Sequence, residues 1–297
     1  MGRSFEVSSA GGVVKLDGST GIRARIAVRG TGMAPVANQW FEGAGDGASY
    51  RGGRVLSRML DLPVKVEAPS SDPENRVLVR QRFADLARVV SQANAPAKLT
   101  FDLDTEGGKD RWFIDVAREG GGDWSWDRNT DGKSFIHSVF SFRTGDPMWT
   151  AEDQEGKEIV PVGVGIGILG VGISLVQLRV GSIDGFGTTT ISNTGEVPAY
   201  PTWTIFAPFS GFSLTSQAGE YLGWVGTVPK ASGYIVVDTK NGTVKDELGA
   251  NRYGELDVRP RFWAVPPGQT VASVVMAGAG AGTRATVTWN RRREVLF

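Results

Sequence analysis

The second half of the chain consists of short strand-like runs separated by turn-forming residues, and this pattern constrains the fold more than any other feature. The runs are rich in β-branched and aromatic residues, with glycine, proline or asparagine between them. Beyond residue 163 no segment shows the apolar spacing of a good amphipathic helix. We therefore predict an antiparallel β-sandwich with strands at 201–207, 233–239, 243–247, 261–265, 270–276 and 283–289.

Two turn signals lie within this half. Asn241-Gly242 predicts a type I′ hairpin turn, because both central residues of that turn need a positive φ. Upstream, Pro198 and Pro201 fix their own φ and restrict the residues before them. The segment from Asn193 to Gly211 is therefore expected to set shape, and not to carry catalysis.

One helix interrupts the strands of the first half. Asp72 can cap it, Pro73 fits its first turn, and Asn94 and Pro96 end it. A single apolar stripe at spacings of three and four residues predicts that the helix packs across an open sheet. The stripe consists of Val79, Phe83, Leu86 and Val90.

Strand-like runs surround this helix at 22–28, 54–60, 98–104, 111–117 and 134–143. Gly107 and Gly108 are expected to join the third and fourth runs as a hairpin. The chain is thus predicted to be mainly β, with two domains. An α+β domain occupies residues 1–157, and a connector with the sandwich occupies residues 158–297.

The charge balance indicates the kind of partner. Lys+Arg 32 equals Asp+Glu 32, so no net field draws the chain to nucleic acid or to an anionic membrane, and protein partners are expected. Five arginines make the early strands locally basic, and we interpret them as a protein contact or a solvated strand face. They are Arg23, Arg25, Arg51, Arg54 and Arg58.

The chain has no cysteine, which excludes disulfides, thiolate metal sites and a cysteine nucleophile. No secretory signal is visible at the start, which predicts synthesis in the cytoplasm.

An uncharged apolar stretch from Ile159 to Leu178 is long enough to cross a bilayer. Its frequent glycines and its Val and Ile residues favour strands or a buried loop over a membrane span. Gly165, Gly167 and Gly170 have GxGxxG spacing, but no helix pattern or well-placed acid follows, which argues against dinucleotide binding. The part at 161–172 is expected to be an interface loop.

Residues suited to catalysis are sparse. His137, the only histidine, has no GxSxG motif beside it and is expected to be a packed or surface strand residue. Asp102 and Asp104 share one face of a strand, where a solvated face explains them better than a glycosidase pair. We therefore predict no enzymatic activity, no catalytic residue and no cofactor.

One loop imitates the first half of a calcium site. Asp127, Asn129 and Asp131, followed by Gly132, place oxygen donors at alternate positions. Ser138 stands where a bidentate Glu would close the cage, and the residues that follow are strand-like. We interpret the loop as a solvated turn and keep its three oxygen donors as a candidate metal site.

The order of several motifs resembles that of the distal tail proteins of bacteriophages with long, non-contractile tails. RGGRVLSRMLDLPV, the single helix, LTFDLD and FSFRTGDPMW resemble the N-terminal ring-forming domain of that family. The second half resembles its galectin-like C-terminal domain. The residues that carry this second resemblance are Asn193, Gly195, Pro198, Pro201, Asp238, Gly249, Asn251, Trp263 and Gly268.

The resemblance implies a structural protein of the virion. Distal tail proteins form a hexameric ring at the distal end of the tail, which joins the tail tube to the tail-tip hub and adhesion apparatus. The implied partners are further copies of the chain, the tail tube protein, the tail-tip hub or tail-associated protein, and receptor-binding or adhesion proteins.

A carbohydrate-binding module that recognises a host surface glycan is the alternative. Exposed aromatic side chains can stack on sugar rings, although they more often anchor cores or subunit interfaces. The candidates for such a contact are Trp124, Trp126, Trp203 and Trp224.

Overall fold

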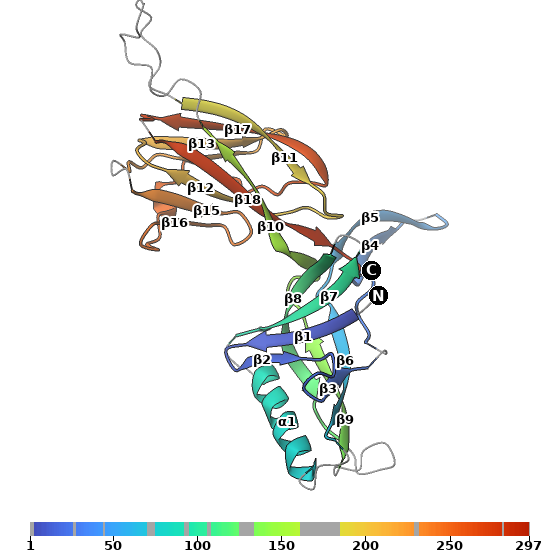
Figure 1. The fold of residues 1–297 in the computed structure, drawn as a ribbon. Coiled ribbons are helices and arrows are strands. Elements are labelled where there is room, and N and C mark those ends of the chain that lie inside the picture. The colour runs from blue at the N-terminus through green and yellow to red at the C-terminus, as the bar shows by residue number, and fades with distance from the viewer. Residues whose placement is uncertain are drawn as a thin grey trace, which may run out of the picture. The chain divides into compact units, whose positions relative to one another are not determined.

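The computed structural model describes residues 3–25, 28–43, 45–69, 75–91, 95–105, 108–124, 134–160, 185–228, 232–280 and 282–296. The chain divides into two compact units (Figure 1). Unit 1 comprises Met1–Glu152 and Arg293–Phe297, and unit 2 comprises Asp153–Arg292. Unit 2 is therefore an insertion in unit 1, and the return of residues 293–297 to unit 1 was not anticipated from the sequence.

The described part of unit 1 contains one helix, nine complete strands and the start of a tenth. They are β1 (Arg3–Ser9), β2 (Gly12–Lys15), β3 (Ile22–Ala24), β4 (Val36–Glu42), β5 (Ala48–Val55), β6 (Met59–Glu67), α1 (Asn75–Val90), β7 (Ala97–Thr105), β8 (Gly108–Gly121), β9 (Phe135–Arg143) and the start of β10 (Trp149–Ile159). The predicted hairpin of the third and fourth runs is confirmed, because β7 and β8 pair antiparallel up to Thr105 and Gly108.

Strands of unit 1 form a closed circuit around its core. β8 pairs with β7 along Gly108–Val116 and with β9 near its end, where a β-bulge shifts the register. One series runs β8-β7-β1-β2 and the other β8-β9-β6-β3. After β2 the two series meet, because the Leu16 carbonyl accepts a hydrogen bond from the Ala24 amide. The strands thus enclose the core instead of forming the open sheet expected from the sequence.

Helix α1 packs against β1, β2, β6 and β9. Its predicted apolar stripe is confirmed: Val79, Leu86 and Val90 are buried, and Phe83 is half-buried against the same core. Each such burial contributes about 1.5–3 kcal/mol. The predicted cap Asp72 and the predicted first-turn Pro73 lie outside the described residues.

The single strand expected at 54–60 is wrong. β5 ends at Val55, β6 begins at Met59, and the chain changes direction between them. Two contacts cause this break. The Leu56 amide bonds the Pro35 carbonyl, and the Arg58 side chain turns inward to backbone carbonyls.

Unit 2 is an antiparallel β-sandwich, as predicted. Its sheets have the orders β16-β15-β12-β18-β10 and β11-β17-β13-β14, and inward residues of both form one apolar core. The strands are β11 (Gly185–Asn193), β12 (Thr202–Phe206), β13 (Gly211–Ser216), β14 (Tyr221–Trp224), β15 (Tyr234–Asp238), β16 (Thr243–Asp246), β17 (Gly268–Ala277) and β18 (Arg284–Arg293), with a 3-10 turn η2 (Tyr253–Glu255).

Two local predictions for unit 2 are wrong. Residues 261–265 form no strand, and Val265 makes only an isolated bridge to Ala199. Pro260 before this segment and Pro266 after it lack the amide hydrogens that a ladder needs.

The turn at Asn241-Gly242 is not type I′ either. Gly242 has a positive φ of 62°, but Asn241 does not have one. The reason is that Asp238 and Thr243 pair directly, so that the loop spans Thr239–Gly242.

Candidate interaction surface

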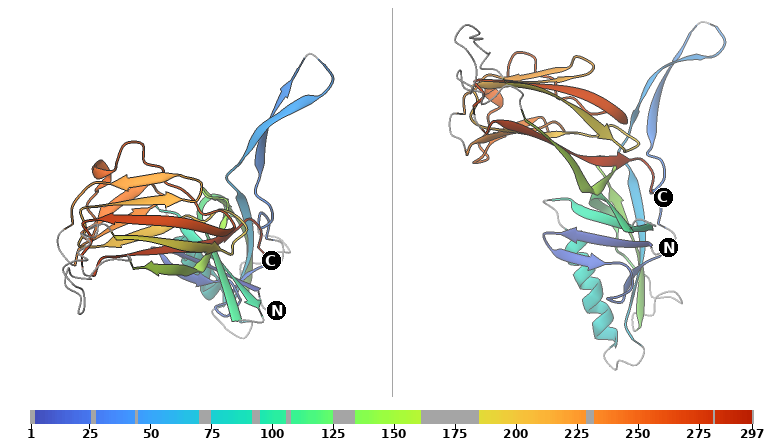
Figure 2. Two further views of the ribbon diagram at one scale, coloured as in Figure 1. Left: turned by 90° about the horizontal axis from the view of Figure 1, so that it is seen from above. Right: turned by 45° about the horizontal axis from the view of Figure 1, so that its top comes forward.

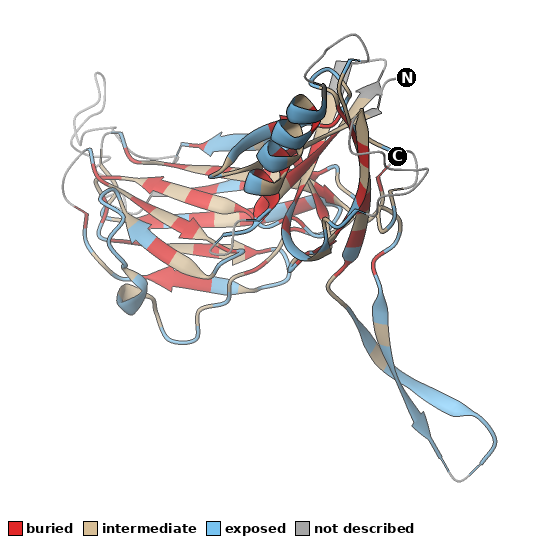
Figure 3. Cartoon of the chain, turned by 90° about the horizontal axis from the view of Figure 1, so that it is seen from below, coloured by how far each residue is buried: buried red, intermediate tan, exposed pale blue. Residues whose placement is uncertain are grey.

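The hairpin formed by β4 and β5 is the most exposed element of unit 1. It extends away from the other strands of the unit (Figure 2). Among the described strands, β4 and β5 pair only with each other. Almost every residue along both strands is exposed (Figure 3). The outer edges of the hairpin therefore present backbone donors and acceptors, which proteins normally cover or pair.

One face of this hairpin carries two exposed pairs of apolar residues, with Asn38 between them along β4. Val36 lies opposite Val55, and Trp40 lies opposite Tyr50 with 5.2 Å between the ring centroids. The two aromatic residues are 60% and 55% exposed, and the two valines are also exposed. We call Val36, Trp40, Tyr50 and Val55 the apolar face of the hairpin. Single exposed apolar residues are ordinary, but four on one face of a single hairpin indicate an interaction site.

The opposite face of the hairpin is more polar. A shift in register next to Trp40 leaves Arg51 without a residue directly opposite, and its guanidinium lies 5.2 Å from the centroid of the Phe41 ring. Arg54 lies across from Ala37 on this face. Arg51 and Arg54 are exposed, in agreement with a protein contact or a solvated strand face.

The sequence contains one signal for this hairpin. Two runs with aromatic residues flank the glycine-rich segment 43–47, which is typical of a hairpin loop. Because both faces of the hairpin are exposed, its strands lack the alternation of buried and exposed residues that identifies most strands.

Arg58 lies at the base of the hairpin and is only 1% exposed. Its Nη1 donates to the carbonyls of Gly30 at 2.9 Å and Gly32 at 2.7 Å, and its Nη2 donates to the carbonyl of Glu294 at 2.7 Å. Burial lowers the pKa of Arg58, while the negative charge of Glu294 opposes this shift. The expectation of a solvated or partner-facing Arg58 is wrong, because three backbone carbonyls take the place of water.

Two of the four tryptophans of the carbohydrate-binding alternative are buried. Trp203 and Trp224 are 0% and 1% exposed, so neither can stack on a sugar, and this part of the alternative is wrong. Trp124 is exposed on one side and packs edge-on against Phe83 at 4.8 Å between the ring centroids. Trp126 lies outside the described residues.

Asp102 and His137 lie in ordinary polar contacts, and the side chain of Asp104 is outside the described part of the structure. Asp102 accepts a hydrogen bond of 2.8 Å from Arg111 Nε, and Arg111 also pairs with Glu6 and Glu152. His137 Nδ1 lies 3.5 Å from Arg25 Nη1 at the surface of β9.

The predicted metal ligands Asp127, Asn129 and Asp131 lie outside the described residues, as do the apolar stretch at 161–172 and the GxGxxG glycines. Within the described ranges, no group of three or more His, Cys, Asp and Glu side chains is placed to hold a metal ion. No helix in the described part of the chain is long and apolar enough to cross a membrane.

The motif residues of unit 2 stabilise turns and places where two backbone segments pass close to each other. The side-chain Nδ2 of Asn193 donates to the carbonyls of Val197 and Val265, both at 3.0 Å, and its Oδ1 accepts a hydrogen bond from the backbone amide of Gly195. A Cβ at Gly195 would lie 2.6 Å from the Arg292 carbonyl oxygen, so the backbones approach too closely for another residue.

The two prolines and the tryptophan of the motif connect these crossings to the core. The Pro198 carbonyl accepts from Arg292 Nη1, and the Pro201 carbonyl accepts from the Thr239 hydroxyl. Trp263 is buried and packs edge-on against Trp203. At the start of β17, Gly268 has a positive φ of 96°.

The remaining motif residues shape two loops. Asp238 accepts the amides of Lys240 and Asn241 and so holds the loop before β16. Gly249 has a positive φ of 78° in the next loop.

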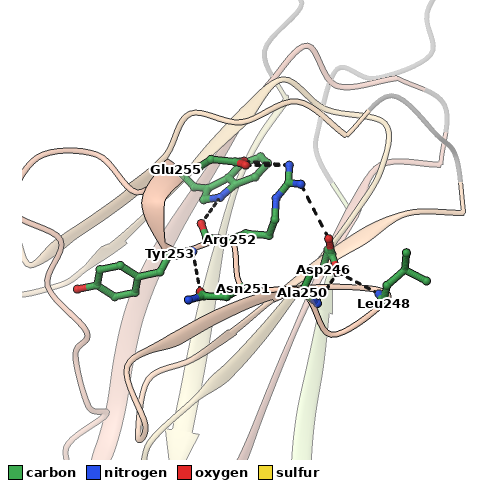
Figure 4. A network of polar contacts seen from close by, with 8 residues as sticks. Asp246, Leu248, Ala250, Asn251, Arg252, Tyr253 and Glu255 are labelled. Atoms are coloured by element: carbon green, nitrogen blue, oxygen red, sulfur yellow. Dashed lines mark hydrogen bonds and ion pairs between the residues drawn. The ribbon is translucent and has the colours of Figure 1, made fainter.

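Asn251 begins a small network in that second loop (Figure 4). Its side chain accepts the Tyr253 amide, and Arg252 pairs with Glu255 at 2.9 Å. Asp246 accepts the amides of Leu248 and Ala250. The network also receives the Trp224 indole, which donates to the Arg252 carbonyl at 3.4 Å. These contacts hold the loop and indicate a structural role for the network.

Replacing Asn193 by alanine is expected to lower the free energy of unfolding by about 2–3 kcal/mol. Asn193 is 2% exposed, and its removal leaves two carbonyls and one amide without their partner. Urea unfolding of the variant measures the loss. Thr194→Ala is the control, because Thr194 is exposed and bonds only the surface carboxylate of Glu155. Equal stability of the two variants would contradict the prediction.

The described residues define a mainly β protein. Unit 1 has a closed ring of strands, one helix packed against it and a protruding hairpin, and unit 2 is an inserted sandwich. This is the fold of Dit-like bacteriophage tail proteins. The chain is similar to the Dit protein of phage SPP1, described as a paradigm of the hub adsorption apparatus in phages that infect Gram-positive bacteria. The TM-score is 0.65 at 14% identity, over 97% of this chain and 98% of that chain.

The chain is also similar to a chain of the phage P2 baseplate in its activated conformation. The TM-score is 0.52 for the structure with Ca and 0.53 for the structure with Sr, each at 11% identity over 100% of both chains. No family model and no curated protein matches the sequence. At these identities the comparisons establish the fold.

Proposed function

We propose that the chain is a distal tail protein, a structural component of a bacteriophage virion. In this proposal six copies form a ring at the distal end of the tail, which joins the tail tube to the tail-tip hub and adhesion apparatus. The fold supports the proposal, since the similar chains come from a hub adsorption apparatus and a baseplate. The role requires no catalytic group.

The exposed apolar face of the hairpin is the observation that carries this proposal. A monomer gains nothing from leaving Trp40 and Tyr50 in water, and burying each contributes about 1.5–3 kcal/mol. If the face of one copy contacts a different face of the next, repetition closes a ring when the rotation is right. A lasting contact of this kind buries more than about 1,000 Å². The hairpin edges would then be covered by the neighbour.

Negative-stain electron microscopy of the purified protein, combined with mass measurement, tests the proposal. The expected result is a ring with the mass of six copies. Imaging of virions with an antibody against this chain tests its location, and the label is expected at the distal end of the tail. A label elsewhere on the virion would overturn the proposal.

The carbohydrate-binding alternative now depends on Trp124 and Trp126, since Trp203 and Trp224 are buried. A glycan array with the purified protein separates the two functions. We expect no specific binding. Saturable binding by the monomer that Trp124→Ala abolishes would favour the alternative.

A further inference from the structure

Three segments that are distant in sequence meet at Arg58. The first is 30–32, whose carbonyls accept from the guanidinium, and the second is Thr144, whose amide donates to the Arg58 carbonyl at 2.9 Å. The third is Glu294, which is 236 positions away in the sequence. Thr144 follows β9 and Glu294 follows β18, whereas 30–35 leads directly into β4. We call residues 30–35 the root of the hairpin.

The segment 294–296 bonds this root at two further points. Glu294 Oε1 accepts the Ala34 amide at 2.9 Å, and the Leu296 amide donates to the Thr31 carbonyl at 3.3 Å. The segment is itself anchored in unit 1. Leu296 is buried in the core cluster, and the Arg293 guanidinium lies 3.7 Å from the centroid of the Trp112 ring. An anchored segment can therefore restrain the root.

The root has few other restraints. No regular strand covers residues 30–35, so a ladder does not fix its backbone. Besides the contacts of Arg58 and residues 294–296, the described bonds of the root include that from the Leu56 amide to the Pro35 carbonyl. A buried guanidinium without acceptors is costly, which makes the contacts of Arg58 mutually dependent.

We propose that residues 294–296 are a brace that holds the root of the β4–β5 hairpin, and that Arg58 is the positioning residue through which the brace acts. The brace follows unit 2 in the sequence, while the root precedes it. The order of the hairpin root therefore depends on residues that are synthesised only after the sandwich. For the proposed ring, a restrained root means that less conformational entropy is lost when the hairpin docks. Only this last consequence rests on the proposed function.

Hydrogen exchange of the full chain, at a concentration at which it is monomeric, tests the brace. In Glu294→Ala, exchange of the amides at 31–36 is expected to accelerate about tenfold, because the Ala34 amide loses its acceptor. Amides of α1 and of β6 are expected to exchange as before. Glu294→Gln keeps an acceptor oxygen and is expected to restore the protection.

Arg58→Met and Glu119→Ala complete the experiment. Arg58→Met is expected to accelerate exchange at 31–36 at least as strongly as Glu294→Ala. Glu119→Ala removes an exposed carboxylate that pairs with Arg143 and is expected to leave the root unchanged. If Arg58→Met unfolds unit 1, the two Glu294 variants alone test whether residues 294–296 restrain the root. Unchanged protection of 31–36 in Glu294→Ala would overturn the brace. Because the monomer is measured, this result is independent of ring formation.

Discussion

A chain in which Trp40 and Tyr50 are both replaced by serine is expected to stay monomeric at concentrations at which the unaltered chain assembles. The two side chains supply most of the apolar face of the hairpin and are largely exposed in the single chain. Burial at a contact gains about 1.5–3 kcal/mol for each, so their loss weakens every contact at least about 100-fold. Mass photometry or sedimentation velocity measures the assembly.

The same variant is expected to keep its fold. Trp40 and Tyr50 contact each other and lie outside both apolar cores, so their removal costs the single chain little. Tyr253→Ser is the matched control, because Tyr253 is an aromatic residue of unit 2 that is 45% exposed. The control is expected to assemble normally. Normal assembly of the double variant, or equal loss in the control, would contradict a role of the apolar face.

Replacing Trp203 by alanine is expected to lower the free energy of unfolding by about 3–5 kcal/mol. Trp203 is 0% exposed, lies on a central strand of its sheet and packs against Trp263 with 5.7 Å between ring centroids. Alanine leaves a large cavity between the two sheets. Urea unfolding followed by circular dichroism measures the loss in the transition of unit 2.

Trp203→Phe provides the control for this second prediction. Phenylalanine keeps an aromatic ring in the core and is expected to lose clearly less stability than alanine. A Trp203→Ala variant as stable as the unaltered protein would show that the residue does not support the core.

Periodicity explains which parts of the fold were predictable from the sequence. The stripe of α1 and the alternation in β7, β8, β9 and five sandwich strands record a buried and an exposed face, and these elements are confirmed. The five sandwich strands are β12, β15, β16, β17 and β18, whereas β11, β13 and β14 were not among the predicted strands. The same alternation could have placed Trp203 inside, because Trp203 and Ile205 share one face of β12.

The candidate site was not predictable by this route. The hairpin has no buried face and therefore no period, and its strand β5 contains two glycines that weaken any strand signal. Burial of Arg58 depends on carbonyls from residues 30, 32 and 294, and no local pattern reports so distant a contact. An arginine is expected at the surface unless buried acceptors for its guanidinium are known.

The insertion of the sandwich between Glu152 and Arg293 has a consequence for limited proteolysis. A single cut in a loop of unit 2 leaves one fragment with Arg58 and another with Glu294, whose carbonyl accepts a hydrogen bond from the Arg58 guanidinium. Both fragments keep part of the same folded body, so the nicked molecule is expected to migrate as one species until denaturant separates the pieces.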